Sequence, residues 1–202
     1  EAYGVLANRG QSVDPVFVTK IEDIHGNILE ESGNPIEKII SEETAFLVTD
    51  AMRDVVDHGT GVRAKAIGRP SAGKTGTTND SKDAWYIGFI PQLLTGVYVG
   101  YDNPKSMGST ETGSRAAAPI WVDFMKNAVA NLSTEQFSQP PGVMTVKVHD
   151  SGRRAAPCDP PEQTFYEHYR VGTEPATDSL IQNLCDSQQR LAASEAENKL
   201  EL

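Results

Sequence analysis

The chain has 202 residues, of which 38% are hydrophobic and 23% are charged, and this composition is typical of a globular protein with at least one core. Its net charge at pH 7 is −10, and an acidic surface argues against nucleic acid or an anionic membrane as the main partner. No apolar run approaches the roughly 20 residues that a membrane-spanning helix needs, so we expect no span in this chain.

The first part of the chain predicts a helix, a hairpin and a longer helix. Residues 2–10 (AYGVLANRG) read as the last turns of a helix that a glycine ends. The β-branched run at 16–21 and residues 28–30 predict two strands around a turn at 25–27. Ser41 is a good N-cap for the next helix. The predicted inward face of that helix consists of Ala45, Val48, Met52, Val55 and Val56.

The middle of the chain predicts an antiparallel sheet followed by a helix. Residues 84–90 and 94–101 read as two strands joined by the short turn at 91–92. Residues 116–132 predict a helix that tolerates Pro119 in its first turn, because no helical N–H bond is lost there. The predicted inward side chains of this helix are Ile120, Phe124, Met125 and Val129.

After residue 132 the composition changes. We predict one domain portion over residues 1–132, followed by an extension at 133–181 in which prolines and glycines cluster. Within the extension, residues 143–149 predict a short strand. Residues 182–202 are polar and acidic, and they predict a tail that is either helical or disordered.

The two cysteines, Cys158 and Cys185, leave two alternatives open. They form a disulfide if the chain lies outside the cytoplasm, and otherwise they are unrelated thiols. Neither belongs to a C-x-x-C motif, and the four histidines are scattered. We therefore expect no metal site.

The stretch at 68–80 (GRPSAGKTGTTND) carries two overlapping motifs. Residues 68–75 match G-x-x-x-x-G-K-[ST], the phosphate-binding P-loop. A P-loop requires a buried strand before it and a helix that starts at the Lys-Thr pair. Here a short, charged run precedes the motif, and GTTND after the lysine is a poor helix start. A P-loop nucleotide binder is therefore the least favoured alternative.

The second motif is K-T-G at residues 74–76, which is typical of a strand beside an acyl-enzyme site. Lys74 supplies a cation that can hold a substrate carboxylate or tune a nearby serine. Thr75 and Thr77 are two residues apart, so on a strand their hydroxyls share one face and can grip the same carboxylate. Gly76 allows close packing, and the backbone N–H of Thr77 can point at an oxyanion. The tripeptide alone is short enough to occur by chance.

Segments on both sides of this motif match one family in the same order. They are 2–10, 59–61, 72–80, 83–88, 96–102 and 117–121. Together they resemble the class A penicillin-binding proteins, the bifunctional peptidoglycan synthases of the 1A type, over roughly residues 2–130. The resemblance implies an α/β fold of the α+β type, part of a β-lactamase/transpeptidase-like fold. In it, helices flank an antiparallel β-sheet, and the active site lies between the sheet edge and a helical subdomain.

The resemblance also implies a reaction, which is serine acyl transfer without a cofactor. It assigns catalytic roles to Lys74 and to the backbone N–H of Thr77. It assigns substrate binding to Lys74, Thr75, Gly76, Thr77 and Thr78. The implied partners are peptidoglycan stem peptides and, as inhibitors, β-lactam antibiotics. The implied location is the periplasmic face, with the full-length protein anchored to the inner membrane.

The chain departs from the family at the nucleophile. The family carries its catalytic serine in S-x-x-K and a second serine in S-x-N, both upstream of the segment that begins at Ala2. Residues 71–74 spell S-x-x-K, but their lysine already belongs to K-T-G, and the S-x-N spelling at 32–34 falls in a glycine turn. We therefore expect a fragment that is inactive alone and is completed by the missing N-terminal part of the same domain. The alternative is a non-catalytic, penicillin-binding-like module that binds peptidoglycan or a partner protein.

Overall fold

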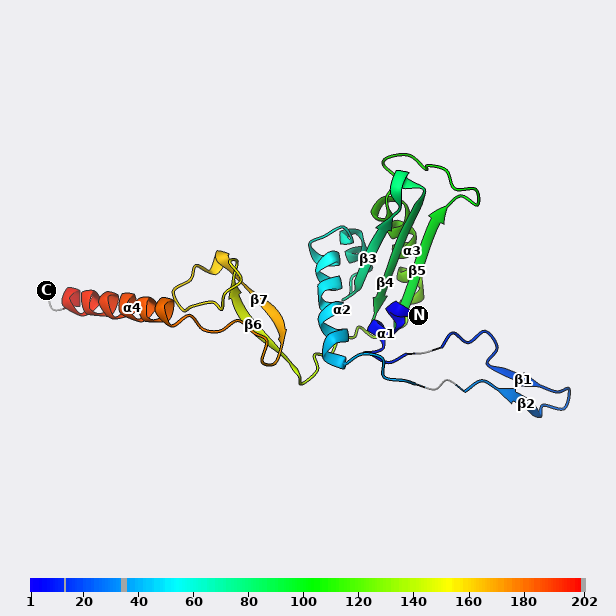
Figure 1. The fold of residues 1–202 in the computed structure, drawn as a ribbon, viewed down its shortest axis with the longest axis horizontal. Helices are drawn as coiled ribbons and strands as arrows, with labels where there is room; N and C mark the ends of the chain where they lie inside the picture. The colour runs from blue at the N-terminus through cyan, green and yellow to red at the C-terminus, as the bar shows by residue number, and fades with distance from the viewer. Residues whose placement is uncertain (13, 34–35, 201–202) are drawn as a thin grey trace. The chain divides into compact units, whose positions relative to one another are not determined.

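The computed structural model describes residues 1–12, 14–33 and 36–200, with the backbone alone over 192–200. These residues form two compact units, Glu1–Pro140 and Pro141–Leu202, each described here by itself (Figure 1). Asn34 of the S-x-N spelling and residues 201–202 of the predicted tail lie outside the described residues. The predicted domain limits at 132 and 181 stay predictions.

A three-stranded antiparallel sheet in the order β3–β4–β5 forms the centre of the first unit (Figure 1). The strands are β3 (Ala72–Thr77), β4 (Asp83–Ile90) and β5 (Leu93–Gly100). They confirm the predicted antiparallel pair. The P-loop alternative is wrong, because the lysine of the motif lies inside β3, and β3 leads through a 3-10 turn, η2 (Asn79–Ser81), into β4.

Helix α3 (Ala118–Ala128) packs against the sheet through Trp121, which is fully buried. The indole N–H of Trp121 donates to the carbonyl oxygens of Gly88 and Thr95, at 3.2 and 3.1 Å. The ring also meets the Tyr86 ring edge to face, with centroids 5.1 Å apart. One side chain of the helix therefore fixes both strands of the β4–β5 pair.

The predicted inward face of this helix is half correct. Met125 and Val129 are buried, but Ile120 and Phe124 are 51% and 52% exposed. A π-helical segment, η3 (Gly113–Ala117), precedes α3, and the buried stripe then follows helical spacing from the first residue of α3 through Trp121. Ile120 and Phe124 fall beside that stripe, so their prediction was wrong.

Helices α1 (Ala2–Ala7) and α2 (Glu42–Asp57) were both predicted, and the Ser41 hydroxyl accepts the N–H of Thr44 as the expected cap, at 3.2 Å. A short 3-10 segment, η1 (Val62–Ile67), follows α2. The inward face of α2 includes Phe46 and Thr49 rather than Val48, which is 41% exposed. A core cluster unites the two helices with the sheet. It contains Met52, Ala72 and Phe89, with Tyr3, Leu6, Ala7 and Phe137 packed against it.

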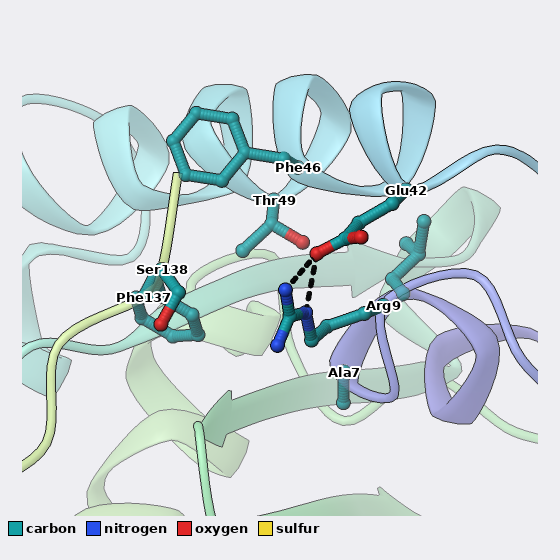
Figure 2. Close-up of a pocket in the computed structure, with 8 residues that line it drawn as sticks. Ala7, Arg9, Glu42, Phe46, Thr49, Phe137 and Ser138 are labelled. Carbon is teal, nitrogen blue, oxygen red and sulfur yellow. Dashed lines mark hydrogen bonds and ion pairs between the residues drawn. The ribbon is translucent and has the colours of Figure 1, made fainter. Parts of the chain in front are cut away.

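Figure 2 shows how the two helices are joined at their ends. The guanidinium of Arg9 pairs with the carboxylate of Glu42, and its Nε donates to the same oxygen at 2.6 Å. Arg9 and Gly10 both have positive φ, at 54° and 91°, which turns the chain sharply after α1. A Cβ at position 10 would collide with the carbonyl oxygen of Ile40, so this turn requires glycine.

Between α1 and α2 lies the predicted hairpin, formed by β1 (Lys20–Glu22) and β2 (Ile28–Glu31). The first strand is shorter than predicted, because residues 16–19 lie outside it. Among the described residues, no helix is both long and apolar enough to cross a membrane.

The second unit contains an antiparallel pair, β6 (Val143–His149) and β7 (Thr164–Arg170), with a 3-10 turn, η4 (Pro161–Gln163), before β7. It continues into helix α4 (Ser179–Leu200). Strand β6 was predicted and β7 was missed. Cys158 and Cys185 form a disulfide with their Cα atoms 5.3 Å apart, which resolves the pairing that the sequence left open.

We predict that Gly113→Ala destabilises the first unit by about 1–3 kcal/mol. A Cβ at Gly113 would lie 2.6 Å from the carbonyl oxygen of Gly76 and closer still to that of Trp85, so η3 would have to move off the β3–β4 pair. Denaturant unfolding measures the change. Gly4→Ala in α1 is the matched control, because a Cβ there meets nothing within 4 Å, and its stability should stay equal or rise slightly. Equal stability of the Gly113 variant would show that η3 is not packed as described.

We also predict an acid-sensitive second unit. The Asp159 carboxylate accepts bonds from the Arg153 guanidinium and, at 2.6 Å, from the Ala156 N–H. The bond from Arg153 is the main cause that lowers the pKa of Asp159 from 3.8 to about 2. The folded pKa is depressed, so this stabilisation is present above pH 3.8 and is lost as the pH falls through about 2.

Hydrogen exchange of the β6 and β7 amides measures this loss. Protection should fall between pH 4 and pH 2 in the parent chain (pKa 3.8 unfolded, about 2 folded). The Asp159→Asn variant should be less protected at neutral pH and should lose less on acidification, whereas exposed Glu162→Gln should behave like the parent. Unchanged acid sensitivity in Asp159→Asn would assign the effect to other carboxylates.

Candidate active site

The K-T-G segment lies along a groove of about 470 Å³ at the edge of the sheet. The five predicted site residues, 74–78, line it together with Tyr3 of α1 and with Trp85 and Ile87 of β4. The structure therefore brings all five together at one open edge. Ser71, by contrast, is buried and lines a separate cavity with Arg69, which agrees with the interpretation that its S-x-x-K spelling is a coincidence.

The pairing of β3 with β4 fixes the direction of each backbone amide in the groove. The N–H of Thr78 donates to the carbonyl oxygen of Asp83 at 3.0 Å, so it points towards β4. Amide directions alternate along a strand of an antiparallel pair. The N–H of Thr77 therefore points away from β4, to the open edge, where it can donate to an oxyanion.

The two hydroxyls of this strand are each held by a residue from another segment. Thr75 Oγ1 lies 2.8 Å from Thr60 Oγ1, and Thr77 Oγ1 accepts the backbone N–H of Gly113 at 3.0 Å. Because the Thr77 oxygen is already an acceptor, its own proton is available for donation to a ligand. The hydroxyl thus adds a second donor beside the Thr77 amide.

Lys74 provides the positive charge of the groove. Its Nζ donates to the carbonyl oxygen of Thr75 at 2.9 Å, and the residue is exposed. Within the described part of the chain, no carboxylate forms an ion pair with Lys74. An anionic group in the groove would therefore meet an uncompensated cation.

A chain of contacts supports the far end of the groove. The N–H of Asp83 donates to Thr78 Oγ1 at 2.8 Å, and the phenol of Tyr98 donates to Asp83 Oδ1 at 2.8 Å. This bond to the carboxylate raises the pKa of Tyr98 above its usual value. The Tyr98 ring lies against the Trp85 ring, with centroids 4.8 Å apart. Trp85 is thus a wall of the groove.

Reasoning from the sequence missed four contributors to this site. Tyr3, Tyr98 and Gly113 had no assigned role. Thr60 was noticed only as part of a similar segment. Each reaches the site through the tertiary fold, so the only local signal was the resemblance of the segments at 2–10, 59–61 and 96–102.

Comparisons with known proteins agree with this geometry. Residues 1–126 match the family model described as the penicillin binding protein transpeptidase domain. Penicillin-binding protein 1A of Aquifex aeolicus is 43% identical over 148 residues, which are 73% of this chain and 20% of that protein. The chain thus spans about a fifth of the length of the curated relatives it matches.

Solved structures show the same fold. The crystal structure of penicillin-binding protein 1A from Haemophilus influenzae matches with a TM-score of 0.79 at 29% identity, over 87% of this chain and 32% of that one. The D,D-transpeptidase domain of a peptidoglycan glycosyltransferase from Eggerthella lenta matches with a TM-score of 0.52 at 25% identity, over 64% and 31%. The predicted α/β fold, with an antiparallel sheet flanked by helices, is confirmed. The chain belongs to the penicillin-binding protein transpeptidase domain family.

Proposed function

We propose that this chain is the C-terminal part of a peptidoglycan D,D-transpeptidase that cross-links stem peptides by serine acyl transfer and reacts with β-lactams. The observation that carries the proposal is the open edge of β3. There the Thr77 amide, the Thr77 hydroxyl and the Lys74 cation converge on one groove. The Haemophilus influenzae and Aquifex aeolicus relatives are named penicillin-binding protein 1A, which supports the same activity.

The groove residues divide between holding the substrate and stabilising charge. Lys74 and the hydroxyls of Thr75 and Thr77 hold the terminal carboxylate of the stem peptide, and Gly76 lets the backbone approach the ligand. Thr78 fixes the end of the strand through Asp83. The backbone N–H of Thr77 donates to the oxygen of the attacked carbonyl, where negative charge develops.

The reaction has two acyl transfers. A serine oxygen, contributed by residues outside this sequence, attacks the carbonyl of the penultimate D-Ala, and its proton passes to the terminal D-Ala as that residue leaves with its amine. An amine of a neighbouring stem then attacks the serine ester, gives up a proton, and restores the serine. A β-lactam enters the same first step, but its opened ring stays attached to the serine.

The proposed reaction requires that the rest of the domain, with its catalytic serine, lie beside this sheet. Trp85 and Tyr98 face outward on β4 and β5 and are 42% and 48% exposed, next to the groove. We propose that the N-terminal part of the domain packs on this face and brings the serine towards Lys74. The disulfide between Cys158 and Cys185 supports an extracytoplasmic location, where we propose that the longer protein is anchored to the inner membrane.

Labelling with a fluorescent penicillin tests the proposal that the catalytic serine belongs to an upstream segment. The 202-residue chain should form no covalent adduct, because it lacks the nucleophile, whereas the chain extended upstream to include the family's S-x-x-K segment should label. Gel fluorescence after denaturation measures the adduct, and circular dichroism checks that both forms are folded. A folded, extended protein without label would instead favour the non-catalytic binding module.

A second prediction concerns the cation. In the extended protein, Lys74→Ala should slow acylation by about 10²- to 10³-fold, because a charge that contacts the substrate and the serine is removed. Stopped-flow penicillin acylation measures the rate. Lys126→Ala, which removes an exposed lysine from α3, should leave the rate unchanged. Equal rates in the two variants would rule out the assigned role of Lys74.

A further inference from the structure

The segment between α1 and α2, residues 12–40, carries the hairpin of β1 and β2 and is called the excursion. Hydrogen bonds join its two ends. The Ser12 N–H donates to the Glu37 carbonyl oxygen at 2.8 Å, and the Ile39 N–H donates to that of Gly10 at 2.9 Å. Gln11 and Lys38 form an isolated β-bridge at the same level. The two ends of the excursion are therefore joined before the hairpin begins. Figure 1 shows β1 and β2 projecting away from the sheet of the first unit.

Large apolar side chains are exposed along this excursion. The most exposed are Phe17 and Ile24 at 96%, Leu29 at 67%, Ile36 at 64%, Val18 at 59% and Ile28 at 55%. A two-stranded hairpin in water is only marginally stable by itself. So many large, exposed apolar side chains on one short segment indicate an interaction site.

The backbone of the hairpin also has free edges. The Ser32 N–H donates to the Thr19 carbonyl oxygen at 2.9 Å, so the backbone groups of these two residues point towards the partner strand of the hairpin. By the alternation of an antiparallel ladder, the backbone groups of the paired neighbours Lys20 and Glu31 point outward. An outward edge accepts a further strand.

The charge of the excursion selects the kind of partner. Residues 12–40 contain six acidic and two basic side chains. Lys20 pairs with Glu22, whereas Glu30 and Glu31 form no ion pair within the described residues. This acidity repels a second copy of the hairpin and an anionic lipid surface, and it attracts a cationic chain.

We propose that the hairpin over residues 16–33 is a docking surface for a cationic protein segment with apolar side chains, which binds in an extended conformation as a third β-strand. Backbone pairing supplies the alignment, the exposed apolar side chains supply contact area, and Glu30 and Glu31 supply the preference for lysine or arginine. The surface is separate from the K-T-G groove, so this proposal does not depend on the transpeptidase activity.

The probe is a fluorescent, end-capped peptide of alternating lysine and valine, titrated into the 202-residue chain and followed by anisotropy. We expect saturable binding that weakens roughly tenfold or more between about 50 and about 300 mM salt. Glu30→Lys/Glu31→Lys should weaken binding at least about tenfold. A peptide with alternate amides N-methylated should also bind at least about tenfold more weakly, because it cannot extend the ladder.

The matched control is Glu135→Lys/Glu162→Lys, which makes the same change in net charge at two exposed positions outside the hairpin and should bind like the parent. Unchanged thermal unfolding shows that each variant is folded. Equal weakening by both double variants, equal binding of a glutamate–valine peptide, or no binding at all would overturn the proposal. So would sedimentation that shows a dimer abolished by Glu30→Lys/Glu31→Lys, because the occupant would then be a second copy.

Discussion

The register between β3 and β4 is the constraint on which the groove depends. Thr78 pairs with Asp83 through both backbone and side chain, and this pairing decides which amides of β3 face β4 and which face the open edge. A slip by one residue would exchange the two sets and would also turn every side chain to the other face of the sheet. The Thr77 amide would then donate to β4 and would no longer face the groove. Tyr98, which holds the Asp83 carboxylate, helps to prevent that slip.

Close approach between segments explains why two positions of β3, 73 and 76, are glycines. A Cβ on Gly76 would lie 3.2 Å from Cβ of Trp85, and one on Gly73 would collide with the hydroxyl of Tyr86. Burial raises the pKa of that Tyr86 hydroxyl above its usual value, so it stays neutral beneath the strand. The third residue of the K-T-G motif therefore meets a packing requirement, beside the chemical roles that we propose for the first two.

Local features of the sequence were sufficient to predict the β3–β5 strands, β6, the Ser41 cap and the K-T-G edge, because each depends on residues that are neighbours in the chain, whereas β7 was missed. The resemblance to the penicillin-binding proteins correctly gave the fold. Contacts between distant segments had no such signal: the bond from Gly113 to Thr77 and that between Thr60 and Thr75 join residues far apart in sequence. The outward positions of Ile120 and Phe124 likewise depend on how Trp121 docks on the sheet, which an apolar pattern alone does not specify.

The bond from the Gly113 amide to Thr77 leaves the Thr77 hydroxyl as a hydrogen-bond donor at the open edge. With its lone pair engaged, the Thr77 hydroxyl turns its hydrogen outward, and the neighbouring amide and ammonium groups also present hydrogens. These three donors favour a ligand that places acceptor atoms beside them, as a carboxylate does. A terminus converted to an amide would lose its negative charge and one of its two acceptor oxygens, so we expect the groove to prefer free acids over amidated forms of nearly the same shape.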